Sequence, residues 1–468
     1  MASNSKPVDT ASDHSVEVDD PVVLQLVAGP HRHRHNIHTV LHSVLTTLAL
    51  FLRIPVHLVW HYILTRWRSP LVQELGRSPL SQVEVLVVRQ FFLQSYLATS
   101  RSIFRSGLPS KWLQKAEIPG TKGVWWAPPG TEGKRGEDDL VLLWIHGGGF
   151  FVDTAPACGL YFAQLTKELN EKRGVKFSIL AVDYELAPEK IYPSQLIETL
   201  AAYHYLVNDL GISPSKICVG GDSAGGNLAI AFLLHLARPN PRITVPKSLG
   251  PTPGKPGSAY IVSPFVDLVS YRPSRSQPFN GDYIDDGGVF AGSLSYVGAV
   301  GPSAPPELKA WFASSSPSWN PLRWFAGGEA ADHPPPDVVD FSLSIEEAEK
   351  EGKGVKLLSS PYVNPHPAVV KDLNWYREAF PSGGRTMVTW GGKEIFSDDV
   401  VDFVEALKKV DVAPVELCKP LGMHDWNIFD TFLPLASRDK NGGEQAKSDF
   451  ALKAVADFFA EKAKEASA

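Results

Sequence analysis

Residues 217–237 read ICVGGDSAGGNLAIAFLLHLA and contain the pattern Gly-x-Ser-x-Gly at 221–225. The apolar residues before this pattern are typical of a buried strand, and the apolar residues after it are typical of a helix. A serine at such a turn sits at the helix N-terminus, where backbone amides favour developing negative charge. Glycines flank it because a Cβ at those positions would clash. The stretch therefore predicts an α/β architecture with Ser223 as a candidate nucleophile.

A second glycine-rich stretch, HGGGF, follows the apolar run LVLLWI at residues 140–145. Consecutive glycines let the backbone approach another group with its N–H bonds turned outward. We expect the amides of Gly147, Gly148 and Ala224 to form an oxyanion hole beside the serine. His146 is interpreted as a packed residue that orients this loop and does not move protons.

The serine hydroxyl is a weak nucleophile and needs a neighbouring base. His424, in the sequence GMHDW, lies in a short loop beyond the last strand-like run, where such a base belongs. His366 comes too early in the chain to follow an acid after the penultimate strand. We therefore predict that His424 is the base, and we interpret Asp425 as a helix cap or loop residue.

The triad acid is expected in TWGGKEIFSDD, residues 389–399, because the chain order in this arrangement is serine, acid, histidine. Glu394 can sit at the C-terminal end of the preceding strand, so we predict that it is the acid, with Asp398 as the alternative. Asp398 and Asp399 directly precede an amphipathic helix, which predicts N-cap and first-turn roles for them. We expect Asp399→Asn to cost only modest stability.

The sequence pattern beyond residue 120 predicts the fold class. Short β-rich runs alternate there with helical stretches: VWWAP, LVLLWIH, FSILAVDY, KICVGG, AYIVSPF, RTMVTWG and VELCKP. Continuous apolar strands that alternate with helices predict an α/β fold with a mostly parallel, buried sheet and helices on both faces. Residues 239–258, rich in proline and glycine, predict a surface excursion.

Four regions follow from these patterns. Residues 1–30 are polar and acidic and are expected to be disordered. Residues 31–68 are expected to form an apolar membrane-associated or cap segment, and 69–118 a helical cap. Residues 119–468 are expected to form the catalytic domain, interrupted at about 270–355 by an insertion too long for a simple connection, which we interpret as part of a cap.

Composition excludes several classes of function. The net charge is −6 and the pI is about 6.2, which gives no reason to expect a nucleic-acid partner. The three cysteines, Cys158, Cys218 and Cys418, are far apart and in no CxxC spacing, so neither a disulfide framework nor a zinc site is expected. We expect no metal and no organic cofactor, and the sequence does not indicate an oligomeric state.

The segment at 37–65 raises the question of membrane association. Residues 37–52 carry no charged side chain, but this run is shorter than the roughly 18–20 residues that cross a bilayer. The segment can span the bilayer only if the Arg53 side chain snorkels to the headgroups. Otherwise it can lie in the membrane interface with its aromatic residues at headgroup depth. A third possibility is a cap helix that packs on a soluble domain. We expect membrane association through residues 37–65, with the cap helix as the alternative.

The motifs together resemble the hormone-sensitive-lipase-like family of α/β-hydrolases. The resemblance covers about residues 120–465 and rests on HGGGF, DYELAPEKIYPSQL, GGDSAGG, AYIVSPFVDL, SSPYVNP and GMHDW. In that family the acid precedes the histidine by about thirty residues, and Glu394 and His424 are 30 positions apart. The chain departs from the family in having glutamate where most members have an aspartate acid, and in having Glu185 where the DYRLAPE pattern has arginine.

The apolar N-terminal segment, the glutamate acid and the long insertions are most similar to fungal steryl acetyl hydrolases. This resemblance implies a serine esterase at the endoplasmic reticulum membrane that cleaves acyl esters of a hydrophobic alcohol such as a sterol. Two alternatives remain open at this stage. One is a soluble, cytoplasmic carboxylesterase of secondary metabolism, and the other is a ligand-binding receptor without catalysis on the same fold.

Overall fold

The computed structural model describes residues 48–467 except 49, 74–77, 94–111, 153, 155–157, 188–189, 242, 244–245, 271, 277–281, 285, 298–353 and 432–448. The predicted disordered region at 1–30 lies outside the described residues. So do the first part of the apolar segment, part of the predicted helical cap and most of the insertion at 270–355.

The centre of the fold is one eight-stranded sheet with the order β1-β2-β4-β3-β5-β6-β7-β8. The strands are β1 (Leu113–Ile118), β2 (Thr121–Trp126), β3 (Leu140–Ile145), β4 (Phe177–Val182), β5 (Ile217–Asp222), β6 (Ser258–Val262), β7 (Thr386–Gly391) and β8 (Val415–Lys419). β2 is antiparallel to both of its neighbours, whereas all strand pairs from β4 to β8 are parallel. The mostly parallel sheet is confirmed, and all seven β-rich runs form strands.

The edge strand β1 corrects one prediction. Residues 69–118 were predicted to be a helical cap, but Leu113–Ile118 pairs with β2 in register from Leu113↔Trp126 to Ile118↔Thr121. The hairpin turn contains Pro119 and Gly120, and Gly120 adopts φ +86°. A Pro-Gly dipeptide between two short runs is the signal for such a turn. The sequence LQKAEI lacks a continuous apolar run, so the strand could not be predicted from it. Only one face of this edge strand is packed, and polar residues are therefore tolerated on the other.

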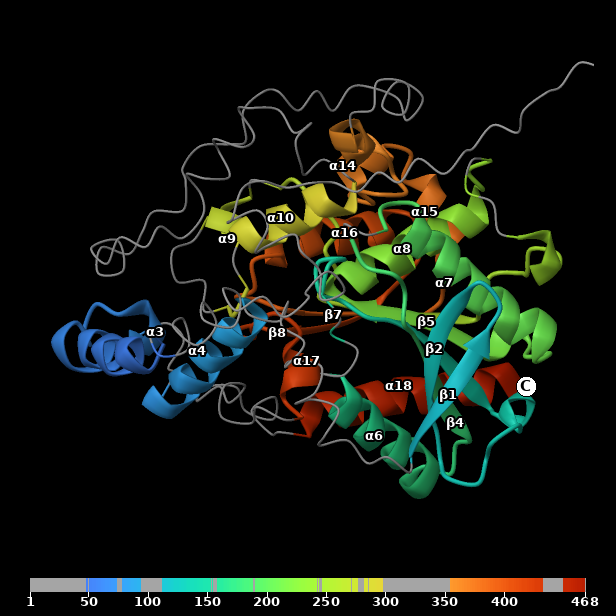
Figure 1. Cartoon of the computed structure of the whole chain (residues 1–468), viewed down its shortest axis with the longest axis horizontal. Coiled ribbons are helices and arrows are strands. Elements are labelled where there is room, and N and C mark those ends of the chain that lie inside the picture. The colour runs from blue at the N-terminus through green and yellow to red at the C-terminus, as the bar shows by residue number, and fades with distance from the viewer. Residues whose placement is uncertain are drawn as a thin grey trace, which may run out of the picture.

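Helices cover both faces of the sheet (Figure 1). Because strand side chains alternate between faces, Val141, Leu143 and Ile145 of β3 point into one apolar core, and Leu140, Leu142 and Trp144 point into the other. The first core is closed by α7 (Ser194–His204), α8 (Ser223–Ala237), α15 (Asn374–Ala379) and α16 (Ser397–Lys409). The second is closed by α6 (Gly159–Lys167) and α18 (Phe450–Ser467).

Smaller elements surround the carboxyl ends of the parallel strands. They are η1 (Val59–Leu64), α3 (Pro70–Gln73), α4 (Pro79–Leu93), α9 (Pro273–Ser276), α10 (Asp286–Tyr296), η8 (Gly354–Ser359), α14 (Pro367–Val370) and α17 (Trp426–Phe429). The helices that precede β1 project to one side of the sheet (Figure 1). Val85 of α4 packs in a small cluster with Tyr283, Met423 and Phe429. Within the described parts of the chain, every helix is too short or too polar to cross a bilayer.

Candidate active site

Ser223 occupies a strained turn between β5 and α8. Its φ is +53°, in the left-handed region that a non-glycine residue adopts only when the surrounding structure imposes it. A Cβ on Gly221 would lie 2.6 Å from the Ile145 carbonyl oxygen, and a Cβ on Gly225 would lie 2.0 Å from that oxygen. Both glycines are therefore required for β3 to pass so close to the turn, as the sequence pattern predicts.

Glu394 and His424 lie together at the carboxyl end of the sheet, although they come from different loops. His424 Nδ1 is 3.9 Å from Glu394 Oε2, and both side chains are buried. Glu394 Oε2 also accepts hydrogen bonds from Ser263 Oγ at 2.7 Å and from the Gly391 amide at 2.9 Å. These two donors fix the carboxylate oxygen that faces the imidazole.

The other ring nitrogen of His424 faces a second carboxylate. His424 Nε2 is 3.3 Å from Asp425 Oδ2, which also accepts a hydrogen bond from Tyr283 Oη at 3.3 Å. Among the residues that the structure describes, Ser223 Oγ makes no hydrogen bond with His424. Catalytic hydrogen bonds are often long before substrate binds, so this geometry is compatible with a base that turns toward the serine.

Burial controls the protonation of this pair. It raises the pKa of Glu394 to about 8, against the hydrogen bonds from Gly391 and Ser263 that favour the ionised form. Burial also lowers the pKa of His424 to about 4, although the charge of Asp282 acts in the opposite direction. The imidazole is therefore neutral at ordinary pH and has a free lone pair with which to accept a proton.

Asp398 and Asp399 stand in the first turn of α16, as predicted, but neither is its N-cap. Phe396 occupies the cap position and no side chain caps the helix. Asp398 Oδ2 accepts the Ser274 amide at 2.9 Å, so this carboxylate is engaged with α9. Asp399 is fully buried and accepts from Ser270 Oγ at 2.6 Å. Asp399 is therefore in the first turn as predicted, but it is also a buried partner of Ser270, which the sequence analysis did not predict.

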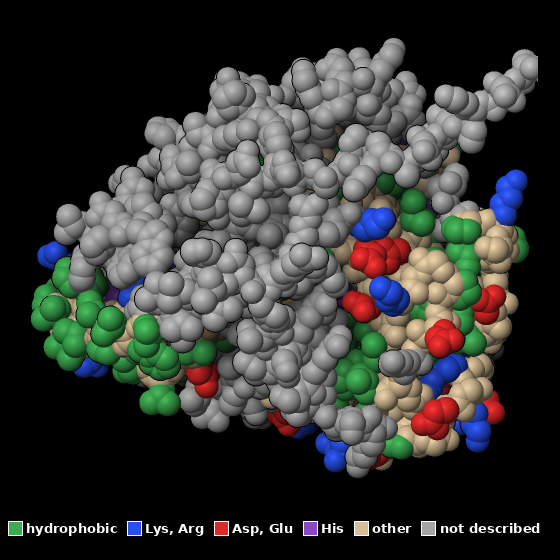
Figure 2. Space-filling model, in the orientation of Figure 1, with side chains coloured by type: hydrophobic (Ala, Val, Ile, Leu, Met, Phe, Trp, Pro, Cys, Tyr) green, Lys and Arg blue, Asp and Glu red, His purple; other side chains and the backbone are tan. Residues whose placement is uncertain are grey.

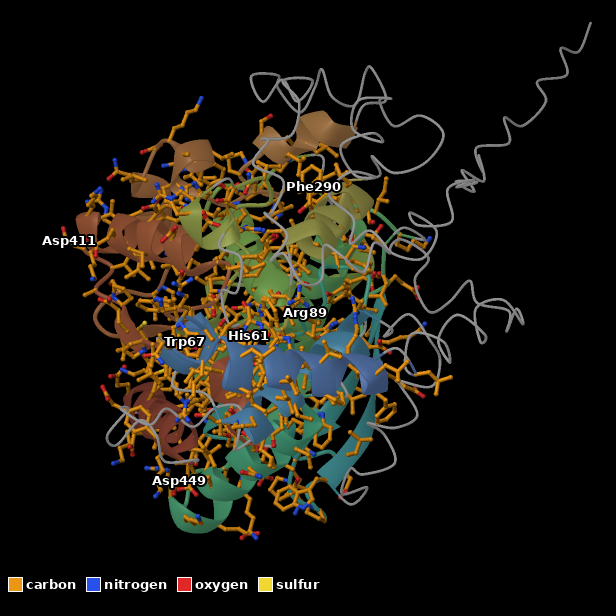
Figure 3. The ribbon with its side chains drawn as sticks, turned by 90° about the vertical axis from the view of Figure 1, so that its left-hand side faces the viewer. His61, Trp67, Arg89, Phe290, Asp411 and Asp449 are labelled. Atoms are coloured by element: carbon orange, nitrogen blue, oxygen red, sulfur yellow. The ribbon has the colours of Figure 1, made fainter. Side chains whose placement is uncertain are left out.

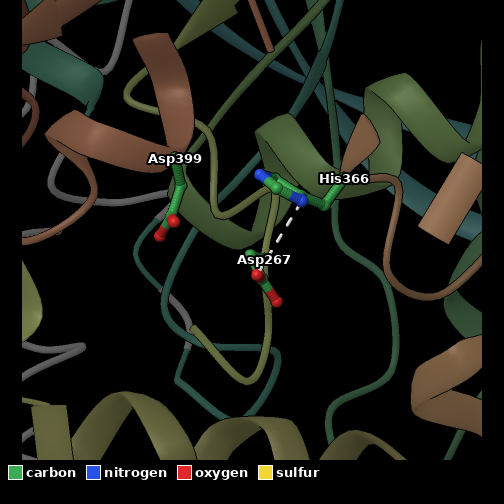
Figure 4. A group of neighbouring side chains, drawn as sticks. All are labelled: Asp267, His366 and Asp399. Atoms are coloured by element: carbon green, nitrogen blue, oxygen red, sulfur yellow. Dashed lines mark ion pairs between the residues drawn. The ribbon is translucent and has the colours of Figure 1, made fainter. Parts of the chain in front are cut away.

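Asp399 belongs to a buried group with Asp267 and His366 that has the spacing of a metal site (Figure 4). Arg275 already neutralises Asp399, with Nη2 3.1 Å from Asp399 Oδ2. His366 Nδ1 lies 3.9 Å from Asp267 Oδ2 and accepts the Ala368 amide, which occupies its lone pair. A cation here would compete with the guanidinium, so the group fits an ion-pair network better than a metal site.

The predicted oxyanion donors divide into two groups. The Gly147 amide donates to Asp222 Oδ1 at 3.0 Å, so in this arrangement its hydrogen is already engaged, and its role as an oxyanion donor stays a prediction. Gly148, at φ +95°, lies where a Cβ would be 2.1 Å from the Val152 carbonyl oxygen. Ala224 is in the first turn of α8, where amides have no intrahelical acceptor. Gly148 and Ala224 therefore remain candidate donors.

His146 has a packing role, as expected. Its ring stacks on Tyr184 with 4.1 Å between centroids and an interplanar angle of 5°, and its Nδ1 lies 2.8 Å from the Gly147 carbonyl oxygen. Tyr184 Oη donates to the His146 carbonyl oxygen at 2.8 Å. These contacts hold the start of the glycine loop against the sheet.

Two residues that the sequence analysis did not single out tie the acid loop to the base loop. Asp282 accepts the His424 amide at 3.1 Å through Oδ1 and the Ile395 amide at 3.0 Å through Oδ2. Ser263, which donates to Glu394, also accepts the Asp425 amide at 3.0 Å. Asp282 lies in the insertion, where no periodic pattern marks it; Ser263 follows directly after an apolar strand run, which is the one available signal.

Comparison with known proteins agrees with this geometry. The family model described as alpha/beta hydrolase fold matches residues 142–298, which include the glycine loop and the serine turn. The hormone-sensitive lipase of Bos taurus is 38% identical over 100 residues, and an esterase of Acinetobacter venetianus is 30% identical over 155 residues. Residues 142–298 therefore match the α/β-hydrolase fold, and over part of its length the chain is similar to hormone-sensitive lipases.

The matches cover only part of each protein. The match to the Bos taurus lipase spans 21% of this chain and 12% of that protein, and the match to the Acinetobacter esterase spans 32% and 44%. A solved structure of a hormone-sensitive lipase from a metagenome library superposes on this hydrolase domain with a TM-score of 0.52 at 17% identity. It covers 82% of this chain and 98% of its own, which shows a shared fold.

Proposed function

We propose that this hydrolase domain is a serine esterase. The observation that carries the proposal is the buried pair of Glu394 and His424 at the sheet edge where Ser223 occupies its strained turn. A strained turn after a strand, a neutral imidazole and a carboxylate oriented by two donors together supply the parts that acyl transfer needs. The esterases and lipases among the relatives support the same reaction class.

In the proposed mechanism, Ser223 Oγ attacks the carbonyl carbon of the ester while His424 Nε2 removes its proton. For this step the imidazole leaves Asp425, which is 3.3 Å away in the structure, and turns toward Ser223. Glu394, in its ionised form, stabilises the resulting imidazolium through Nδ1, so the reaction is expected to be faster as pH rises toward the raised pKa of this carboxyl, about 8. His424 then returns the proton to the leaving alkoxide, and the alcohol departs from an acyl-enzyme. Water, activated by the same imidazole, hydrolyses the acyl-enzyme.

The tetrahedral oxyanion is stabilised in this proposal by the amides of Gly148 and Ala224. The Gly147 amide takes a different part, because its hydrogen bond to Asp222 fixes the loop. Gly149 adopts φ +60° and follows directly, so its amide is the third candidate donor. Each such donor typically contributes a few kcal/mol to lowering the barrier.

The alcohol portion of the substrate is proposed to be hydrophobic. Tyr283, Met423 and Phe429 form an apolar cluster with Val85 of α4 directly beside His424, and the Phe396 ring packs edge-on against the imidazole at 4.9 Å. Such a lining favours a large apolar group. The resemblance to fungal steryl acetyl hydrolases makes a sterol acetate at the endoplasmic reticulum the finer form of the proposal.

Replacement of the nucleophile tests the reaction. Ser223→Ala is expected to abolish burst release and steady-state hydrolysis of p-nitrophenyl acetate, because no hydroxyl remains to be acylated. Ser258→Ala is the matched control, since Ser258 is a buried serine at the opposite end of the neighbouring strand β6. Hydrolysis that survives in Ser223→Ala would refute the esterase and favour a ligand-binding protein on this fold.

A substrate series tests the finer proposal. Cholesteryl acetate and p-nitrophenyl acetate are compared with butyrate and palmitate esters of the same two alcohols. A higher kcat/KM for acetates, and for the sterol over the simple phenol, is expected for a sterol deacetylase. Equal use of small soluble esters would instead favour a carboxylesterase of secondary metabolism.

A further inference from the structure

The N-terminal helical hairpin has an inverted distribution of polar and apolar side chains. Residues 50–58 are α-helical and continue into the π-helix η1, which is followed by α3 and α4. Along this segment, pairs of exposed residues alternate with pairs of more buried ones. The alternation has the period of a helix, so one face points toward the protein and the other toward solvent.

The face that points toward the protein combines polar groups with Leu50, Ile54 and Leu58. His57 Nε2 lies 3.3 Å from Gln82 Nε2 of α4, and His61 Nδ1 lies 3.0 Å from Ser69 Oγ. The His57 and His61 rings are 4.4 Å apart. Burial, followed by the nearby charges of His61 and Arg89, lowers the pKa of His57 to about 4. Figure 3 shows His61 and Arg89 on these helices, which lie across the carboxyl side of the sheet.

The opposite face is apolar and exposed. Its side chains retain large exposed fractions, among them 66% for Phe51, 75% for Leu52, 66% for Ile63 and 69% for Trp67. The remaining members of this stripe are Leu48, Val56, Val59, Trp60 and Leu64. Hydrophobic side chains gather over these helices at the left of Figure 2. A helix that only capped a soluble domain would place these residues inward and the histidines outward.

We propose that this face, the apolar stripe of residues 48–67, docks the protein on an anionic lipid surface. Trp60 and Trp67 carry the amphipathic rings that prefer headgroup depth. Arg66 and Arg68 flank Trp67 and are exposed, so they can contact anionic headgroups as the stripe enters the acyl boundary.

This orientation brings the proposed active site close to the lipid. The same hairpin continues into α4, whose Val85 packs with Tyr283 and Met423 beside His424. α4 therefore contacts both the docked helix, through Gln82 and His57, and the apolar cluster beside the imidazole, through Val85. That consequence rests on the proposed esterase, whereas the docking itself does not depend on catalysis.

Vesicle flotation with the full chain tests the docking. The probes are vesicles of phosphatidylcholine alone and of phosphatidylcholine with about 30% phosphatidylserine, which gives an anionic surface. The wild-type chain is expected to float with the anionic vesicles, and Leu52→Glu combined with Ile63→Glu to reduce the bound fraction about tenfold or more. Arg66→Gln with Arg68→Gln is expected to remove the preference for phosphatidylserine.

Leu160→Glu provides the matched control, because Leu160 is an exposed leucine on α6, away from the stripe. Circular dichroism melts and hydrolysis of p-nitrophenyl acetate establish that each variant is folded. A wild-type chain that hydrolyses esters but does not float with either kind of vesicle would refute the docking. It would not contradict the proposed esterase. A wild-type dimer that the stripe variants convert to a monomer, without vesicle binding, would assign the face to a second copy and also refute it.

Discussion

Glu394 Oε2 lies 3.9 Å from His424 Nδ1, whereas the carboxylate of Asp398, four positions further along the same loop, is held by the Ser274 amide. The two acids that the sequence offers for one role thus have different partners. Glu394 faces the base, and Asp398 joins the start of α16 to α9.

The first prediction follows from this difference. Glu394→Gln is expected to lower kcat about 10³- to 10⁴-fold with little change in KM, because the amide neither stabilises the imidazolium nor selects its tautomer. Asp398→Asn is expected to keep kcat within about threefold, since its partner is a structural amide. Steady-state kinetics on a p-nitrophenyl ester measure both. A crippled Asp398→Asn beside an active Glu394→Gln would reverse the assignment.

The second prediction concerns the pH dependence of stability. The pKa of folded Glu394 is about 8 against 4.5 when exposed, so the folded state binds the extra proton and stability falls as pH rises through this range. The pKa of His424 falls from 6.5 to about 4, which makes stability rise with pH up to about 6.5. Of these two groups, only Glu394 still changes the stability between pH 6.5 and 8, where its effect amounts to about 2 kcal/mol.

Glu394→Gln removes that ionisation. Denaturant unfolding at pH 6.5 and at pH 8 is therefore expected to give a smaller loss of stability in the variant than in the wild type, by up to about 2 kcal/mol. Other buried acids, such as Asp222 and Glu198, titrate in both proteins, so the difference between the two isolates Glu394. Identical pH dependence in the two proteins would show that Glu394 is already ionised near pH 6.5.

The third prediction replaces the modest role first expected for Asp399. Asp399→Asn leaves the buried Arg275 guanidinium without its partner carboxylate and is expected to cost about 3–5 kcal/mol of unfolding free energy. Asp402→Asn is the control, because Asp402 pairs with Arg272 at a half-exposed position and is worth about 1 kcal/mol or less. Urea unfolding measures both. Equal costs would mean that burial does not distinguish the two pairs.

What the sequence predicts well is what local pattern encodes. The strands β3 to β7 are short and fully buried, because both faces of the parallel sheet are covered, and their mostly apolar runs are recognisable in the sequence. Ser223 and its glycines were recognisable because the turn requires glycine on steric grounds. Glu394 was separated from Asp398 by its place at the end of β7.

The roles that the sequence does not predict are those of residues whose partners are far away in the chain. Asp399 looked like a first-turn charge of an amphipathic helix, but Arg275, 124 positions away, draws it into the core. The glycine-rich motif predicts the Gly147 amide as an oxyanion donor. It does not reveal the hydrogen bond of this amide to Asp222, because that bond depends on the rotation of one peptide plane. The inward histidines of the N-terminal hairpin could not be read from periodicity, which does not reveal which face meets the protein.

The last prediction separates a serine that positions the triad from one that only stabilises the fold. Ser263 Oγ and Ser270 Oγ each donate to a buried carboxylate, at 2.7 Å to Glu394 and at 2.6 Å to Asp399. Ser263→Ala removes a donor that favours the ionised form of Glu394, so its pKa is expected to rise further. The pH profile of kcat/KM is then expected to shift to higher pH, with about tenfold lower activity at pH 7. Ser270→Ala is expected to lower the unfolding midpoint and to leave the pH profile unchanged. A pH profile that shifts equally in both variants would show that Ser263 does not position Glu394.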